Sequence, residues 1–229
     1  MDPTSSQFNK LYDAMSEFVN TAMAGYDPSH NPAHVHRVLN LANKILVAEQ
    51  ALHPEKQYSA SIVKLAALLH DIGDRKYLPS LESLSDTRLD PTTMVEQALL
   101  AQGASADLAS KVQTIVSHVS YTTECKDPSV IKRLIEEGYS ELAIVQDADR
   151  LDALGAIGIG RCFTFLGSQG KKFAVDGKWE MDNSIEHFGD KLVKLEGMMK
   201  TETGRKMARA RTERIELFRE WWREEIDSS

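Results

Sequence analysis

LAALLHDIGD, residues 65–74, is part of the most hydrophobic segment of the chain, and its apolar run ends in two polar groups, His70 and Asp71. Residues 59–71 predict a helix that is apolar nearly all round, which is typical of a central, buried helix. A buried imidazole or carboxylate is unstable unless another group pairs with it. We therefore expect a partner for both side chains at the end of this helix, and a divalent cation would serve.

The rest of the chain also places apolar residues at the helical spacings of three and four. Predicted helices cover residues 7–24, 32–50, 92–103, 105–120, 129–137, 141–167, 184–200 and 203–226. Residues 73–91 lack this periodicity and predict a long surface loop that could act as a lid, and residues 168–183 predict a polar excursion such as a hairpin. The sequence favours an all-α fold with one domain over residues 1–229. Its core would cover about residues 27–170, with the C-terminal helices of residues 184–226 packed on it.

The composition limits the classes of function. The chain has 229 residues, of which 42% are hydrophobic and 27% charged, as in an ordinary globular protein. The net charge of −7 argues against non-specific nucleic-acid binding, which needs a basic surface. No apolar run approaches the about 18 residues that span a bilayer, and the N-terminus does not resemble a secretion signal. Since Cys125 and Cys162 fit reduced thiols, we expect a cytoplasmic protein without a membrane partner.

Two residues far from the His-Asp pair extend the metal hypothesis. His34 shares a helix face with Val38 and Ile45, so its imidazole should face the core. Asp149 follows the apolar Ile144 and is also expected to point inward. Two imidazoles and two carboxylates can share one divalent cation, because the carboxylates balance its charge and the imidazoles donate lone pairs.

Three segments resemble the HD-domain superfamily of metal-dependent phosphohydrolases: HVHRV at 34–38, HDIGD at 70–74 and QDADRLDALGAIG at 146–158. The chain is most similar to the small single-domain HD hydrolases of bacteria and fungi, which also have a C-terminal stretch like TETGRKMARARTERI at 201–215. The similarity covers roughly residues 27–225. It implies a single HD-domain helical bundle and four metal ligands, His34, His70, Asp71 and Asp149.

The resemblance also implies roles for other residues near these motifs. Asp74 lies where some family nucleotidases keep an acidic residue that orients or deprotonates the attacking water, although it could simply cap a helix. His118 is the only histidine between Asp71 and Asp149, so a full second metal site is not expected. It could contact a substrate phosphate, donate a proton, or be structural. Asp152 shares a helix face with Asp149, and we expect it to support the metal-binding histidines.

Phosphoryl transfer needs positive charge near the phosphate oxygens. Lys76 and Arg37 are the first candidates, Lys76 for catalysis as well as for substrate binding, and Arg205 and Arg209 follow. Each could instead form a salt bridge or lie on a solvated helix face. For the ion we expect Mn²⁺ first, with Mg²⁺, Co²⁺, Ni²⁺, Fe²⁺ and Zn²⁺ as alternatives, since the ligand set mixes nitrogen and oxygen.

A nucleotide is the expected substrate, though another phosphorylated small molecule would suit the same site. Nucleoside triphosphate pyrophosphohydrolysis is the first expected activity and removal of a 5′-phosphate the second. A di-iron HD-type oxygenase and a non-catalytic nucleotide or metal sensor stay open as alternatives. Trp221 and Trp222 near the C-terminus predict either docking of the last helix or the seam of a homodimer.

Overall fold

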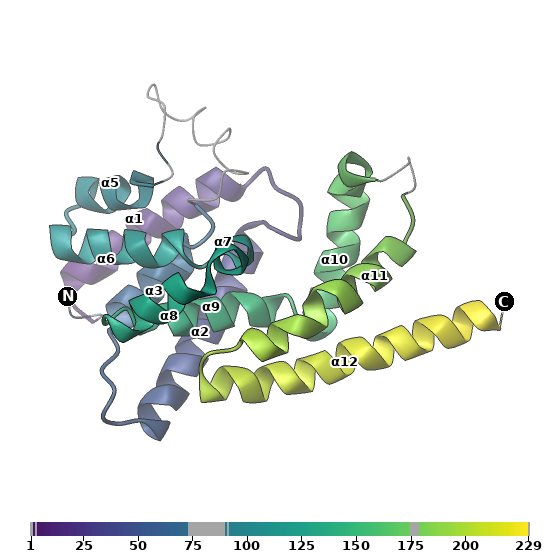
Figure 1. Cartoon of the computed structure of the whole chain (residues 1–229). Coiled ribbons are helices and arrows are strands. Elements are labelled where there is room, and N and C mark those ends of the chain that lie inside the picture. The colour runs from purple at the N-terminus through teal and green to yellow at the C-terminus, as the bar shows by residue number, and fades with distance from the viewer. Residues whose placement is uncertain (1, 3, 73–89, 91, 175–178, 229) are drawn as a thin grey trace.

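The computed structural model describes residues 2, 4–72, 90, 92–174 and 179–228, and these residues fold into helices without a strand (Figure 1). The all-α prediction is confirmed. The elements are α1 (Ser6–Met23), α2 (Pro32–Leu52), α3 (Ala60–Leu69), α5 (Met94–Ala101), α6 (Ala106–Ser117), α7 (Tyr121–Lys126), α8 (Pro128–Glu136), α9 (Glu141–Asp152), α10 (Gly155–Gln169), η1 (Gly170–Phe173), α11 (Asp182–Asp190), η3 (Leu192–Met198) and α12 (Glu202–Asp227).

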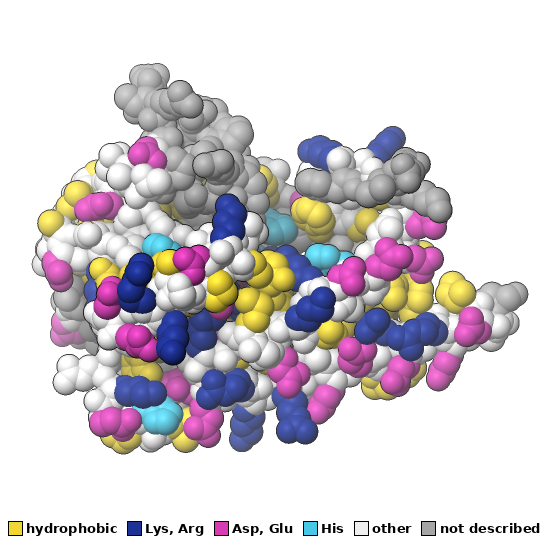
Figure 2. Space-filling model, in the orientation of Figure 1, with side chains coloured by type: hydrophobic (Ala, Val, Ile, Leu, Met, Phe, Trp, Pro, Cys, Tyr) yellow, Lys and Arg dark blue, Asp and Glu magenta, His cyan; other side chains and the backbone are white. Residues whose placement is uncertain are grey.

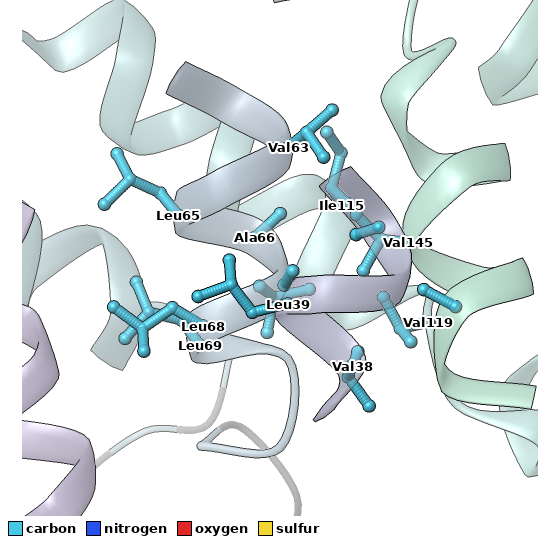
Figure 3. Close-up of a cluster of buried hydrophobic side chains, with 14 of the residues drawn as sticks. Val38, Leu39, Val63, Leu65, Ala66, Leu68, Leu69, Ile115, Val119 and Val145 are labelled. Carbon is cyan, nitrogen blue, oxygen red and sulfur yellow. The ribbon is translucent and has the colours of Figure 1, made fainter. Parts of the chain in front are cut away.

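Helix α3 is the central helix, as its all-round apolar pattern predicts. It packs against α1, α2, α6 and α9. Figure 3 shows its side chains beside those of α2, α6 and α9 and of Val119, which follows α6. The labelled members of this cluster are Val38, Leu39, Val63, Leu65, Ala66, Leu68, Leu69, Ile115, Val119 and Val145. The small Ala66 and Ala67 are fully buried, which allows neighbouring backbones to approach closely. This packing fixes the C-terminal end of α3, where His70 lies.

Helix α2 begins at Pro32, the first residue of the helix predicted over residues 32–50. The Oδ1 atom of Asn31 accepts a hydrogen bond from the amide of Ala33 at 3.1 Å, and Pro32 occupies the first turn. His34 therefore lies in the first turn of α2 and is 1% exposed. The position of the cap therefore determines which residue of the first turn points into the core, and this residue is His34.

The single helix expected over residues 141–167 is wrong at one point. Helix α9 ends at Asp152, Leu154 is extended, and α10 starts at Gly155 with φ of +70°. This left-handed conformation is one that a residue with a Cβ rarely adopts. Figure 1 shows α10 turning away from the line of α9. The break lies directly after the candidate site residues Asp149 and Asp152, so the direction of α10 determines which of its side chains lie near them.

Other helices are shorter than their patterns suggest. The helix predicted over residues 105–120 ends at Ser117 as α6, and the separate α7 begins only at Tyr121. The segment 184–200 contains most of α11 followed by η3. Residues 168–173 continue α10 into η1 instead of forming a strand, whereas residues 175–178 lie outside the described part of the chain.

The C-terminal helix α12 packs on α2, α9, α10 and η3. Its N-terminus is held by Asp147 of α9, a fully buried carboxylate that accepts hydrogen bonds from the amides of Lys200 and Thr201 and from the Thr201 hydroxyl at 2.7 to 3.1 Å. Asp147 therefore fixes the turn before α12 and its N-cap residue Thr201, whose hydroxyl in turn accepts a hydrogen bond from the amide of Gly204. Trp222 stacks on Phe163 and so docks α12 on α10, whereas Trp221 is 53% exposed. A homodimer stays a prediction.

Acidic and basic side chains alternate along α12 in the space-filling view (Figure 2). This pattern is typical of a solvated helix face. The helices in the described residues are each too short or too polar to cross a membrane.

Candidate metal centre

Two imidazoles meet at the end of α3. The Nε2 atoms of His34, from α2, and His70, from the end of α3, lie 3.2 Å apart, and the ring planes cross at 75°. Both residues are buried. Residues that are 36 positions apart in the chain therefore share one small, enclosed space.

The hydrogen bonds at the other ring nitrogens decide what these Nε2 atoms can do. The Nδ1 atom of His70 lies 2.8 Å from the carbonyl oxygen of Ala67, which can only accept, so this nitrogen carries the proton. The Nδ1 atom of His34 likewise donates to Asp152 Oδ2 at 2.8 Å. In the neutral rings both Nε2 atoms then present lone pairs to each other. Such an arrangement is repulsive unless a proton or a metal ion lies between them.

Two carboxylates complete the group. Asp71 Oδ2 lies 3.4 Å from His34 Nε2 and 3.7 Å from His70 Nε2, and Asp149 Oδ1 lies 3.6 and 3.7 Å from the same atoms. The ligand atoms of His34, His70 and Asp149 all lie within 4.8 Å of one another. With bonds near 2.1 Å, atoms that share one ion are roughly 3 to 3.5 Å apart, so the group could hold a divalent cation.

The group is closed on the imidazole side and open on the carboxylate side. The imidazole side chains are each 1% exposed, whereas the Asp71 side chain is 13% exposed and the Asp149 side chain 27%. Solvent therefore reaches the carboxylates. An ion held there could keep positions for water or for a substrate oxygen.

Asp152 anchors His34 from behind and is itself buried. Its carboxylate accepts a hydrogen bond from His34, two from Arg37 at 2.7 and 3.0 Å and one from Arg161 at 3.0 Å. Burial raises the pKa of Asp152, but the hydrogen bonds from His34 and Arg37 and the charge of Arg161 outweigh burial and hold the pKa well below its ordinary value. Asp152 is thus a permanent carboxylate, as its predicted supporting role requires.

The pKa of His34 indicates which charge is stable at the imidazole. Burial lowers the pKa of His34, yet the hydrogen bonds to Asp152 and Asp71 outweigh burial and raise the pKa above its ordinary value. The surroundings of the imidazole therefore stabilise a positive charge. A proton supplies one positive charge there, and a divalent cation would supply two.

The predicted phosphate-binding residues lie in different places. The guanidinium of Arg37 donates a hydrogen bond to Asp152, and the Arg37 side chain is 32% exposed. Arg205 donates to the carbonyls of Met199 and Lys200 in the turn before α12. Arg209 pairs with Glu213 at 3.6 Å on an exposed face of α12. Of these three predicted arginines, only Arg37 connects to the histidine group among the contacts of the described residues, through Asp152.

The predicted catalytic residues are described only in part. His118 caps the end of α6, where its Nδ1 atom lies 2.7 Å from the Thr114 carbonyl, and it does not belong to the compact group of ligand atoms. Asp74 and Lys76 lie outside the described residues, as does most of the expected lid at 73–91. Their roles stay predictions.

Sequence reasoning missed Arg161, which joins the site from α10. Its Nη1 atom binds Asp152, its Nε atom donates to the Ser29 carbonyl at 2.7 Å, and its side chain is 14% exposed. A usable signal was present, because Arg161 is the single charge in the otherwise small and apolar stretch 153–163.

Comparison with known proteins gives several close matches, although no family model matches the chain. The chain is 34% identical over 204 residues to YpgQ of Bacillus subtilis, an uncharacterized protein, across 88% of this chain and 87% of YpgQ. The crystal structure of YpgQ in complex with ADP superposes with a TM-score of 0.69 at 28% identity over 96% of both chains. An HD-superfamily hydrolase from Bacillus thuringiensis superposes with a TM-score of 0.66 at 26% identity, over 98% of this chain and all of that one.

Proposed function

The chain belongs to the HD-domain superfamily of hydrolases, and from this premise we propose that it is a divalent-metal-dependent phosphohydrolase acting on a nucleotide. The observation that carries the proposal is the pair of facing Nε2 atoms of His34 and His70, with the carboxylates of Asp71 and Asp149 beside them. The ADP bound in the YpgQ crystal structure supports a nucleotide as the ligand.

In this proposal His34, His70, Asp71 and Asp149 are the metal ligands, and Mn²⁺ is the ion to test first. The bound ion would lower the pKa of a water molecule and screen the charge of a phosphoryl oxygen. Asp152 keeps the proton of His34 on Nδ1, so that the lone pair of Nε2 stays available to bind the ion. Asp74 orients the attacking water and accepts its proton.

The first proposed reaction is cleavage of a nucleoside triphosphate into a monophosphate and pyrophosphate. The water oxygen bonds to the α-phosphorus, the bond from that phosphorus to the bridging oxygen breaks, and pyrophosphate leaves with the electron pair. Lys76 and Arg37 would balance the negative charge of the phosphate oxygens. Removal of a 5′-phosphate from a nucleoside monophosphate uses the same groups and is the second reaction to test.

The test is a panel of nucleoside mono-, di- and triphosphates with Mn²⁺, Co²⁺, Mg²⁺ or Ni²⁺, in which phosphate and pyrophosphate release are measured. We expect release that depends on the ion, that Asp71→Ala abolishes, and that the exposed control Asp190→Ala retains. Asp74→Asn should still bind the ion but turn over slowly. If Asp74→Asn loses the ion as well, the proposed role of Asp74 is wrong.

The same preparation separates the two alternative functions. Two irons per chain together with oxygen consumption would indicate a di-iron oxygenase. Nucleotide binding without turnover across all four metals would indicate a sensor. Either result would overturn the proposed hydrolysis.

A further inference from the structure

One face of α10 lies against the short segment 27–30 that precedes α2. Arg161, Phe165 and Ser168 are spaced four and three residues apart, so they share this face. Arg161 donates to the Ser29 carbonyl, and the Phe165 ring meets the His30 ring edge to face at 5.7 Å between centroids. The face therefore follows the segment along its length.

The far end of this contact is also hydrogen-bonded. Burial raises the pKa of Asp27, but hydrogen bonds from Ser29 and Ser168 outweigh burial and keep the pKa below its ordinary value. The carboxylate of Asp27 is thus charged and held in place by both sides of the contact. Hydrogen bonds and a ring contact therefore hold segment 27–30 against α10.

The contact between segment 27–30 and α10 extends to the candidate metal centre through His30. The rings of His30 and His34 lie 6.2 Å apart between centroids. The Nδ1 atom of His30 is 2.6 Å from the hydroxyl oxygen of Ser29, and that hydroxyl donates its own proton to Asp27. Since the hydroxyl has only one proton, Nδ1 of His30 is the donor in the bond between them. The His30 ring is therefore held in one orientation beside the metal ligand.

Phe165 differs from the other phenylalanines of the C-terminal helices. Phe163, Phe188 and Phe218 pack on one another with ring centroids 5.8 to 6.1 Å apart, and Phe188 is fully buried. Phe165 is 36% exposed, although it sits only two ring contacts away from His34. Figure 2 shows histidine and basic side chains where α10 approaches the main body.

We propose that the exposed ring of Phe165, backed by His30, is the surface on which the base of the nucleotide substrate stacks. The inference rests on the proposed function. Every base has a flat aromatic face, and such a face stacks well on an aromatic side chain without selecting one base strictly. Phe165 is joined to His34 through His30 by centroid separations of 5.7 and 6.2 Å, a distance that a ribose with one or two phosphates can bridge. With its phosphates at the carboxylates of Asp71 and Asp149, a nucleotide would therefore bring its base to Phe165.

Binding of two probes, ADP and inorganic pyrophosphate, tests this assignment in the presence of Mn²⁺. The probes share a diphosphate and differ in the nucleoside. A stacking ring should affect ADP alone, whereas a ring that only packs α10 against segment 27–30 should affect both probes or neither. Isothermal titration calorimetry of each probe with wild type and variants measures the difference.

We expect Phe165→Ala to weaken ADP binding about 5- to 100-fold, the loss of one stacked base, and to leave pyrophosphate binding unchanged. Phe165→Tyr, which keeps an aromatic face, should bind ADP nearly as wild type does. Trp221→Ala removes an exposed aromatic ring from α12 and is the matched control, with wild-type affinity for both probes. Circular dichroism checks that every variant is folded.

Two failures can be told apart. Equal affinity of wild type and Phe165→Ala for ADP, or equal losses for ADP and pyrophosphate, would overturn the stacking surface and leave the proposed hydrolysis intact. A wild-type protein that binds pyrophosphate but neither binds nor cleaves any nucleotide would overturn the nucleotide substrate and the stacking surface together.

Discussion

Asp152 and His34, 118 residues apart in the chain, are joined by a hydrogen bond of 2.8 Å between two buried side chains. The same carboxylate also binds the guanidinium groups of Arg37 and Arg161. One side chain thus fixes the tautomer of a candidate metal ligand and holds two arginines next to it. The orientation of the imidazole depends on a residue that would not touch the ion.

Asp152→Asn should therefore weaken metal binding. An amide has the shape of the carboxylate but no charge, so it holds the Nδ1 proton of His34 less firmly. Loss of such a supporting partner typically lowers metal affinity about 10- to 100-fold. Titration of Mn²⁺ by calorimetry measures the change, with Asp190→Asn on the exposed face of α11 as the control. Unchanged affinity in Asp152→Asn would show that the hydrogen bond does not tune His34.

A second buried charge network should determine stability instead of metal binding. Glu124 of α7 forms ion pairs with Arg150 of α9 and, at 2.9 Å, with Lys200 before α12, and Arg150 is 2% exposed. Removing the negative charge leaves two cations in a buried place. Glu124→Gln should lower the free energy of unfolding by about 3 to 5 kcal/mol.

Urea denaturation measures this loss. Glu136→Gln, which breaks the exposed pair with Lys132 on α8, is the control and should change stability little. Similar small losses in both variants would mean that the network around Glu124 contributes no more than a surface pair.

Much of the fold follows from apolar spacing, because burial selects the same residues that the spacing identifies. The stripe with Val38 and Ile45 correctly predicts an inward His34, and the apolar run of residues 59–71 correctly predicts a buried α3. The partners of the buried charges do not follow from spacing. Arg161 reaches Asp152 across a helix break, and such a contact depends on the direction in which α10 leaves α9.

The break itself is invisible to periodicity, since residues 141–167 keep helical spacing on both sides of it. What ends the helix is the backbone of Gly155, at φ of +70°, where an added Cβ would lie 3.2 Å from Cγ of Arg211. A glycine in the sequence allows this conformation but does not require it. Gly160, five residues later, lies inside α10 in an ordinary helical position with open space around it.

These two glycines should respond to alanine in opposite ways. Gly155→Ala forces a left-handed alanine against Arg211 and should lower the free energy of unfolding by about 1 to 2 kcal/mol. Gly160→Ala should raise it by up to about 1 kcal/mol, because alanine is the better helix former. Thermal and urea unfolding measure both values. Equal effects of the same sign would contradict the assignment of Gly155 as the helix break.

Acid should weaken the packing of α11 through His187, which is half-buried on that helix. Burial lowers the pKa of His187, the charge of Lys191 lowers it further, and Asp190 opposes them only in part. The unfolded chain takes up a proton at this histidine near about pH 6.5, whereas the folded chain does so only at lower pH. The contribution of His187 to stability is therefore intact above about pH 6.5 and is lost as the pH falls from there towards the folded pKa.

His187→Gln removes this titration and should make stability less sensitive to acid. Urea unfolding of wild type and variant at pH 7.5 and 5.5 measures the difference, and comparison of the two proteins cancels the other titrating groups, including His34. We expect the wild type to lose more stability than His187→Gln between the two pH values. If both proteins lose the same amount, the imidazole of His187 titrates alike in the folded and unfolded chains, and burial on α11 does not disfavour its charged form.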